Sequence, residues 1–552
     1  MKEFSKNLSR VFFTIWIVAA SFCQAVSQDR DDETKLIVGV VVDQMRQEYL
    51  TRFYDKFGDE GFKKLLEEGF EMQNAHYNYV PTATGPGHAS IYTGTTPAFH
   101  GIVSNNWYDR DLKKSIYCVY DSTERTVGSK TKAGMASPQN LLSTTITDEL
   151  KLFSQFESKV ISVAIKDRSA ILPAGHKPDG AFWFDAESGN FVTSTYYMDE
   201  LPGWLRVFNN RKLPKTYLNQ QWTTVFPIDQ YTESTRNDDK YVISLSENGR
   251  FPYDLKKISI EREDKGYEVI PFTPFGNDLT LEVAKAAIDG EGLGKNDKLD
   301  FLAVSFSSTD IIGHSYGPEA VEIEDTYIRL DKNIAELISY LDEKVGKDKY
   351  VMFLTADHAG ADNPQFLMDR NFPAGFFHKD KAFDQINGFL TSKYGEAEWV
   401  EDIDYFQVYL NQDLIAKREL SLRLVRQQVA DFLLENDEIL LSYSGYLLGE
   451  SDYNSGGGLG FMVRGYMAQE SGDVLFGLKS GWLDWFSKKG TTHGTFYTYD
   501  THVPIIFYGN VPKGKSVRRC EITDIATTLS LMMGIKFPSA ATGESIVELF
   551  DD

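Results

Sequence analysis

The feature that most constrains the fold is an uninterrupted apolar run at positions 36–42, Leu-Ile-Val-Gly-Val-Val-Val. Because no polar residue alternates with the β-branched ones, the run predicts a strand buried on both faces, as in a parallel sheet covered by helices. Similar runs recur at 160–165, 301–306, 350–354 and 503–508. Helical patterns occur between or after them at 51–69, 138–153, 279–288, 322–345 and 522–533. This alternation predicts an α/β fold with a doubly wound, mainly parallel central sheet flanked by helices.

Two stretches interrupt the alternation, at about 185–275 and 361–489. Both are rich in aromatic and turn-forming residues with short strand-like pieces, which predicts cap insertions above the sheet. A chain of 552 residues can bury one large core or two moderate ones. Because the two stretches interrupt one continuous α/β pattern, we expect residues 28–552 to form a single domain with two cap insertions.

The N-terminus has the order of a secretory signal peptide. Three basic residues among the first ten precede an apolar run at 11–20 and small residues that end at Ser27. The apolar run is well short of the ~20 residues that span a bilayer, which argues against a permanent anchor. We expect residues 1–27 to be removed and the mature protein to be periplasmic or extracellular, without stable membrane insertion. Lipid attachment at Cys23 stays open, although Phe22 fits that processing signal poorly.

Charge and cysteine content exclude several classes of protein. The net charge of −23 makes nucleic acids and anionic membranes poor partners. Beyond the leader only Cys118 and Cys520 remain, so one disulfide is allowed and a zinc site built from cysteines is excluded.

Ionisable side chains follow four of the predicted strands, where the strands end. In open α/β sheets, ligands bind beyond the carboxyl ends of the strands, so these groups are expected at one rim. They are Asp43 after the first strand, Lys166 after the second, Asp310 and His314 after the third, and Asp357 and His358 after the fourth.

Together with His493, these aspartates and histidines supply two sets of three metal ligands. Taken singly, a strand-end Asp is usually a turn or helix cap, and a lone His is usually a satisfied, partly buried residue. Three protein ligands leave a zinc ion one open position, which is the catalytic pattern. Two such ions ~4 Å apart would clamp the entering and leaving oxygens of an in-line displacement at phosphorus.

Thr84 is the candidate nucleophile. It stands just outside the expected start of a helix in Pro-Thr-Ala-Thr-Gly-Pro-Gly-His, where Pro86 suits an early helical position. Amides at such an end attract anions. The alternative is a simple Thr N-cap, and since the hydroxyl is a weak nucleophile at neutral pH, catalysis would require metal coordination of Thr84.

Three further side chains could hold a phosphate. Lys166 and Arg168 come directly off the strand at 160–165, and Arg binds phosphate through its fork while Lys acts as a point charge. Asn105 could donate to a phosphoryl oxygen. The alternatives are a solvated charged loop for the first two and a turn residue for Asn105. The other histidines, including His88, are expected to be structural.

These residues resemble the alkaline phosphatase superfamily, and most closely its PafA-type branch of bacterial phosphate monoesterases. The order, spacing and local context of seven motifs carry the resemblance. They are Val-Val-Asp43-Gln-Met-Arg, Pro-Thr-Ala-Thr84-Gly-Pro-Gly-His-Ala-Ser, Gly-Ile-Val-Ser-Asn105, Ile-Lys166-Asp-Arg168, Ser-Thr-Asp310-Ile-Ile-Gly-His314, Thr-Ala-Asp357-His358 and Thr-His493-Gly-Thr.

The resemblance implies an alkaline-phosphatase-like fold and two zinc ions. One ion would be held by Asp43, Asp357 and His358 and would activate Thr84. The other would be held by Asp310, His314 and His493 and would take the leaving-group oxygen. Thr84 would form a covalent phosphothreonine that water at the zinc site hydrolyses, while Asn105, Lys166 and Arg168 bind the non-bridging phosphoryl oxygens.

The resemblance also narrows the substrate. Nucleotide pyrophosphatase and phosphodiesterase relatives share the Thr, the Asn and both zinc sites but lack the Lys and Arg pair. A monoester has an extra charged oxygen that Lys166 and Arg168 can neutralise. The expected activity is therefore release of inorganic phosphate from small-molecule monoesters. A nucleotide pyrophosphatase/phosphodiesterase on the same scaffold is the alternative, and a non-catalytic surface protein with structural zinc is a third hypothesis.

Overall fold

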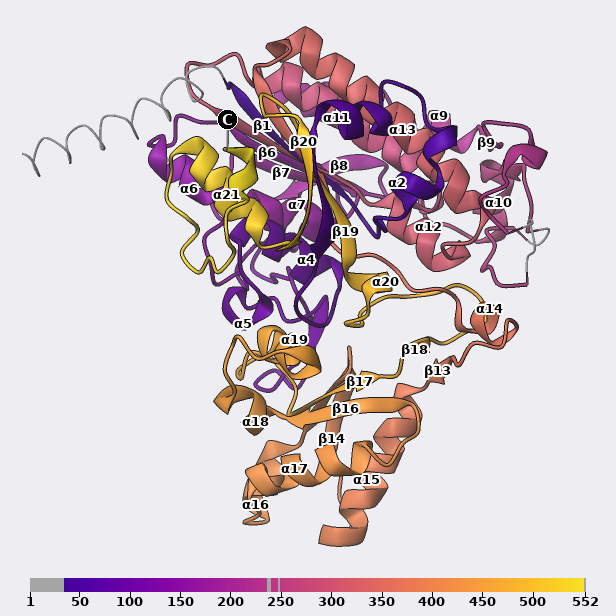
Figure 1. The fold of residues 1–552 in the computed structure, drawn as a ribbon, viewed down its shortest axis with the longest axis vertical. Helices are drawn as coiled ribbons and strands as arrows, with labels where there is room; N and C mark the ends of the chain where they lie inside the picture. The colour runs from indigo at the N-terminus through magenta and orange to yellow at the C-terminus, as the bar shows by residue number, and fades with distance from the viewer. Residues whose placement is uncertain (1–33, 236–239, 247–248, 551–552) are drawn as a thin grey trace, which may run out of the picture.

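A ten-stranded mixed sheet forms the centre of the protein, in a computed structural model that describes residues 34–235, 240–246 and 249–550 (Figure 1). The strand order is β20-β2-β19-β12-β1-β11-β6-β7-β8-β5. Their bounds are β1 Leu36–Val42, β2 Phe70–His76, β5 Thr126–Val127, β6 Val160–Ala164, β7 Gly180–Asp185, β8 Asn190–Ser194, β11 Asp300–Phe306, β12 Tyr350–Thr355, β19 His502–Gly509 and β20 Gly514–Glu521.

The sheet is parallel at its centre and mixed toward its edges. β1 pairs in parallel with both β11 and β12, and β11 pairs in parallel with β6. All residues of β1 and β11 are buried, as expected for strands covered on both faces. The predicted strand at 503–508 exists as β19 but runs antiparallel to β12 and to β2, because an apolar run specifies burial and not direction.

Helices cover both faces of the sheet (Figure 1). On one face pack α4 Thr84–Thr93, α6 Ile146–Phe153, α7 Asp167–Ala174 and α21 Asp524–Met533. On the other pack α11 Phe275–Glu291, α12 Ser308–Tyr316 and α13 Val321–Leu341. The sequence prediction of doubly wound α/β layers is confirmed.

Two predicted helices are shorter than expected. The segment 51–69 is not one helix but α2 Tyr49–Arg52, a 3-10 turn at Tyr54–Lys56, and α3 Phe62–Glu68. At the break, Gly58 N and Phe62 N donate to the Asp331 carboxylate, and Gly61 has no room for a side chain because a Cβ there would lie 2.2 Å from Asp331 Oδ1. The helix expected at 138–153 begins only at Ile146, where Thr145 and Asp148 form a capping box.

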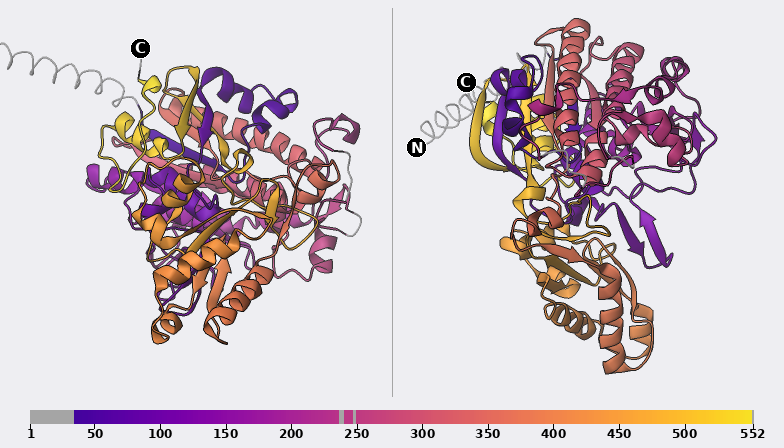
Figure 2. Two further views of the ribbon diagram at one scale, coloured as in Figure 1. Left: turned by 60° about the horizontal axis from the view of Figure 1, so that its bottom comes forward. Right: turned by 90° about the vertical axis from the view of Figure 1, so that its right-hand side faces the viewer.

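The two interrupting stretches differ in structure. Part of the first joins the central sheet as β8, antiparallel to β7, and the remainder includes α8 Gly203–Asn210, α9 Leu213–Leu218 and α10 Leu255–Glu261. The second builds a separate antiparallel sheet in the order β14-β15-β17-β16, with its own apolar core. Figure 2 shows this second module, residues 375–484, extending from the main body.

The helices of the second module pack against both faces of its small sheet: α15 and α17 contribute to the core on one face, and α18 and α19 to the apolar cluster on the other. The bounds of the module's elements are β13 Gly375–Phe377, α15 Lys379–Tyr394, β14 Val400–Asp404, β15 Gln407–Leu410, α16 Gln412–Lys417, α17 Leu422–Leu433, β16 Ile439–Ser444, α18 Gly445–Glu450, α19 Gly457–Gly465, β17 Val474–Leu478 and β18 Trp482–Asp484.

The predicted leader at 1–27 and Cys23 lie outside the described residues. Across the described ranges, no helix combines the length and apolar character needed to cross a bilayer. Cys118 and Cys520 are both buried and unpaired, so the disulfide that the sequence allowed is not formed.

Candidate active site

The four central strands end at one edge of the sheet and bring the predicted acidic and basic residues together. Val42 of β1 stands opposite Phe306 of β11, and Val41 stands opposite Thr355 of β12. The residues that follow these ends therefore meet, as expected for parallel strands in register. The groups gathered there are Asp43, Lys166 at the start of α7, Asp310 and His314 on α12, and Asp357 and His358 after β12.

Asp43, Asp357 and His358 form a first cluster of potential metal ligands. His358 Nε2 lies 3.6 Å from Asp43 Oδ1 and 3.7 Å from Asp357 Oδ2. All three side chains are fully buried. The structure thus brings together the first predicted ligand set.

Asp310 is the centre of a second cluster. Its Oδ1 lies 3.2 Å from His314 Nε2 and 3.7 Å from His493 Nε2. His358 also comes within 4.8 Å of the Asp310 and His493 ligand atoms, because its ring stacks on His493 with centroids 3.6 Å apart. Of the second predicted set, Asp310 and His493 form a candidate metal group together with His358, while His314 lies beside Asp310 and outside that group.

The histidine rings are oriented so that an acceptor nitrogen faces the carboxylates. Each Nδ1 lies within hydrogen-bonding distance of a backbone carbonyl: 2.8 Å from Ala359 O for His358, 2.9 Å from Thr491 O for His314, and 2.7 Å from Thr82 O for His493. A carbonyl only accepts, so Nδ1 carries hydrogen and a neutral ring turns the Nε2 lone pair toward the aspartates.

This arrangement fits bound cations. Asp43 Oδ1 and Asp357 Oδ2 are buried without a hydrogen-bond partner among the described residues. Imidazole lone pairs and carboxylate oxygens facing one another repel unless a positive charge lies between them. Neutral imidazole and carboxylate are donors that zinc accepts. The donor chemistry therefore fits divalent metal ions such as zinc.

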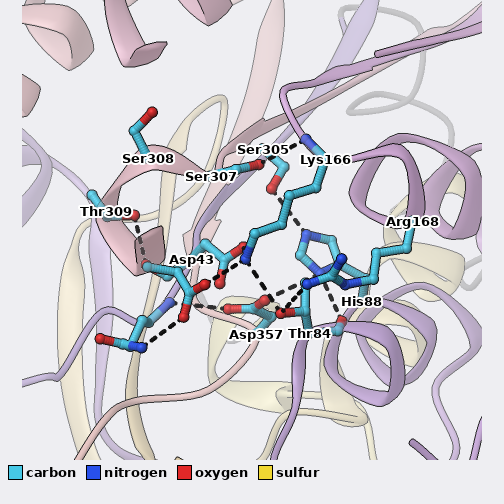
Figure 3. Close-up of polar contacts among 12 residues, drawn as sticks. Asp43, Thr84, His88, Lys166, Arg168, Ser305, Ser307, Ser308, Thr309 and Asp357 are labelled. Atoms are coloured by element: carbon cyan, nitrogen blue, oxygen red, sulfur yellow. Dashed lines mark hydrogen bonds and ion pairs between the residues drawn. The ribbon is translucent and has the colours of Figure 1, made fainter. Parts of the chain in front are cut away.

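The cationic side chain of Lys166 lies between the two ligand clusters. Its Nζ lies 2.7 Å from Asp43 Oδ2 and 2.6 Å from Asp310 Oδ2, so it joins the two clusters (Figure 3). Burial and the nearby Asp357 charge raise the pKa of Asp43 well above its ordinary value, although Lys166 opposes the rise. Burial also acts to raise the pKa of Asp310, but His314 and Lys166 outweigh it and hold that pKa well below its ordinary value.

Thr84 lies between these clusters and the basic residues (Figure 3). Its Oγ1 is 3.4 Å from His358 Nε2, 3.5 Å from Lys166 Nζ and 3.3 Å from Arg168 Nη2. The sequence placed Thr84 just outside the helix; the structure makes it the first residue of α4, with Ala83 as N-cap. The hydroxyl therefore does not cap the helix and is free for other contacts.

Arg168 and Asn105 complete the group around Thr84. Arg168 Nη1 donates to Tyr117 Oη at 3.1 Å, while its Nε is buried without a partner among the described residues. Tyr117 in turn donates to Asp167. Asn105 Oδ1 accepts a hydrogen bond from Gly85 N at 2.7 Å, which ties it to the first turn of α4.

Two polar residues near the clusters were not among the predicted site residues. His88 was expected to be only structural, yet its Nδ1 lies 3.0 Å from Thr84 O and 3.3 Å from Asp357 Oδ2. Gln44 donates from Nε2 to Asp310 Oδ1 at 2.6 Å and from its backbone to Asp357 Oδ1 at 3.2 Å. His88 stands one helical turn after Thr84, a spacing that could have revealed it.

Gly87 explains part of the motif around Thr84. A Cβ at this position would lie 2.1 Å from Asp357 O. Only glycine therefore lets α4 approach the loop that carries Asp357 and His358.

Comparisons with known proteins identify relatives of this chain. The sequence profile of the type I phosphodiesterase / nucleotide pyrophosphatase family matches residues 37–457. Alkaline phosphatase PafA of Elizabethkingia meningoseptica is 44% identical over 93% of this chain and 94% of its own length. The crystal structure of wild-type PafA has a TM-score of 0.89, with 43% identity, 94% of this chain covered and 99% of that chain.

Two further relatives cover nearly the same length. Alkaline phosphatase PhoV of Synechococcus elongatus is 41% identical over 93% of this chain and 92% of its own length. A Myroides odoratus protein named calcium-transporting ATPase is 40% identical over 98% of this chain and 100% of its own.

Proposed function

This chain belongs to the type I phosphodiesterase / nucleotide pyrophosphatase family and is a PafA-like alkaline phosphatase, a phosphoric monoester hydrolase, and we propose the following mechanism for it. It is an exported enzyme that transfers the phosphoryl group of a monoester to Thr84 and then to water, with two zinc ions as cofactors. Residues 28–552 form the single catalytic domain, with insertions at about 185–275 and 361–489.

Two zinc ions fit the two ligand clusters. Asp43, Asp357 and His358 would hold one, and the second set, Asp310, His314 and His493, would hold the other. When bound, the ions would supply Lewis acidity for the attacking hydroxyl and for the leaving oxygen. The buried carboxylate oxygens without partners and the three ring orientations support this assignment.

Thr84 Oγ1 is the proposed nucleophile. Its bond to phosphorus forms as the bond from phosphorus to the alcohol oxygen breaks, which leaves a phosphothreonine and a free alcohol. Water then displaces the Thr84 oxygen and inorganic phosphate leaves. Support comes from the place of Thr84 at the first helical residue, 3.4 Å from His358 and within 3.5 Å of two cationic side chains.

The observation that carries the monoester assignment is the convergence of Lys166 and Arg168 on Thr84. A phosphate monoester carries one more charged oxygen than a diester, and two cations beside the nucleophile can neutralise it. The buried Arg168 Nε provides a donor whose hydrogen bond a phosphoryl oxygen can accept. Asn105 would orient a further phosphoryl oxygen.

The alternative, a nucleotide pyrophosphatase or phosphodiesterase on the same scaffold, is less favoured. The family profile carries that name, but the relatives at 44% and 41% identity are named alkaline phosphatases. The name of a third relative, calcium-transporting ATPase, implies phosphate release from ATP, which is a phosphoanhydride and not a monoester. Small phosphate monoesters are the proposed substrates, and the acidic chain is not expected to bind nucleic acids.

The test compares hydrolysis of p-nitrophenyl phosphate with that of bis-p-nitrophenyl phosphate. The wild-type protein should hydrolyse the monoester faster. Thr84→Ala should abolish turnover while zinc content, measured by atomic spectroscopy, is retained. Thr93→Ala is the matched control, because Thr93 ends the same helix and bonds only to Ala89 O among the described residues. Turnover by Thr84→Ala, or faster diester hydrolysis by wild type, would refute the proposal.

A further inference from the structure

A two-residue hairpin turn in the second module reaches the site. Strands β14 and β15 are joined by Tyr405 and Phe406, with Asp404 paired to Gln407. Both turn residues have positive φ, 43° for Tyr405 and 62° for Phe406. Turns with positive φ at both positions favour Asn and Gly, and bulky residues are strained there. Such strain persists only where the surroundings hold it, and it concentrates at functional sites.

Tyr405 contacts a proposed phosphate-binding residue. Its hydroxyl accepts a hydrogen bond from Asn105 Nδ2 at 3.0 Å. The other end of the same amide, Oδ1, accepts from Gly85 N at 2.7 Å. A backbone N–H only donates, so the oxygen must face Gly85 and the NH₂ group must face Tyr405. Asn105 is therefore held at both ends, by α4 and by the second module.

Phe406 packs the turn against the segment that carries His493. A Cβ built on Gly494 would lie 3.3 Å from Phe406 Cε2, so the ring packs directly beside the residue that follows His493. The Phe406 ring also makes an edge-on contact with Phe476, with ring centroids 5.9 Å apart. The turn is thus placed between Asn105 and the second ligand cluster.

The Tyr405 hydroxyl stays protonated in this place. Burial raises the pKa of Tyr405, although the hydrogen bond from Asn105 and the charge of Arg168 act in the opposite direction. Since the oxygen accepts from Asn105, its own proton points elsewhere. The phenol can therefore hold the amide and keep one donor of its own.

We propose that Tyr405 is a positioning residue for the phosphoryl group, which acts through Asn105. It fixes the direction of the Asn105 amide so that the second N–H of Nδ2 is available to a phosphoryl oxygen. This inference rests on the proposed function, because it needs Asn105 to bind substrate. It also gives the second module a part in catalysis, since its strained turn carries the tyrosine.

Tyr405→Phe tests the proposal by removing only the hydroxyl. We expect kcat/KM for p-nitrophenyl phosphate to fall by about 3- to 10-fold, the effect of one net hydrogen bond. The inhibition constant of inorganic phosphate should rise by a similar factor. The dependence of rate on leaving-group pKa in a series of aryl phosphates should not change, because the leaving oxygen is not involved. Tyr409→Phe, on β15 of the same hairpin, is the control that should match wild type.

A double-mutant cycle separates positioning from general stability. Tyr405→Phe combined with Asn105→Ala should be no slower than Asn105→Ala alone. Tyr405→Asn relaxes the turn, because Asn tolerates positive φ, so its melting temperature should equal or exceed that of wild type while its kcat/KM falls. Together these results would support the proposal.

Three outcomes would overturn it. If Tyr405→Phe equals wild type while Asn105→Ala is impaired, or if the two substitutions multiply, Tyr405 does not act through Asn105 and the proposed function stands. If Asn105→Ala itself turns over monoesters and binds phosphate like wild type, the phosphoryl role of Asn105 is wrong and the inference falls with it.

Discussion

Replacing Arg168 with Ala should reduce monoester hydrolysis far more than diester hydrolysis. The Nη1 contact with Tyr117 fixes the guanidinium, which leaves the buried Nε and the Nη2 beside Thr84 as donors for a phosphoryl group. Hydrogen bonds to charged groups contribute about 1.5–3 kcal/mol each, so loss of two costs about 3–6 kcal/mol. That corresponds to roughly a 10²- to 10⁴-fold fall in kcat/KM for p-nitrophenyl phosphate.

The diester bis-p-nitrophenyl phosphate has one charged oxygen fewer, so we expect it to lose one such bond at most, about 10- to 150-fold in kcat/KM. The assay is initial rates with both substrates at subsaturating concentration, with zinc content and melting temperature measured on the same preparations. Arg206→Ala, at an exposed arginine, is the control. An equal loss on both substrates, with zinc retained, would contradict the reasoning that Arg168 recognises the extra monoester charge.

Three other outcomes follow from the structure. Chelation of divalent ions should abolish turnover and lower the melting temperature, because buried carboxylates then face imidazole lone pairs, and added zinc should restore both; full activity after verified metal removal would contradict this. Gly87→Ala should destabilise the fold and lower activity, since its Cβ would meet Asp357 O at 2.1 Å, whereas Gly203→Ala, with no atom within 4 Å, should be tolerated in thermal melts. Burial and the neighbouring His502 lower the pKa of His76 to about 4 in the folded protein. As the pH drops from about 6.5 to 4, His76 is therefore protonated in the unfolded chain before it is protonated in the folded protein, and the free energy of unfolding falls. Urea titrations across this range should show a weaker pH dependence in His76→Gln, and an unchanged slope would refute the assignment.

Several of the candidate site residues could be predicted from the sequence because they follow an apolar run. Asp43, Lys166 and Asp357 follow strands whose burial is legible locally, and parallel neighbours end at one edge. His88 was set aside although it stands one helical turn after Thr84, because the sequence does not show that it faces an aspartate 269 positions away. Gln44 was missed for the same reason.

Tyr405 shows the same limit more strongly. Tyr405 lies in the stretch that predicted a cap insertion, and only the two-residue turn of β14 and β15 brings its hydroxyl to Asn105, which lies 300 positions earlier. The broken helix at 51–69 also depends on a distant residue, because Asp331 occupies the space beside Gly61.

The sequence by itself determined the buried strands, the layers of helices around them and the rim at which the ionisable residues gather, because apolar periodicity and strand ends are local properties. The tertiary structure decided the antiparallel direction of β19, the separate sheet of the second module and the contacts of His88, Gln44 and Tyr405. Those depend on which distant segments meet, and burial pattern alone carries no information about strand direction or partner.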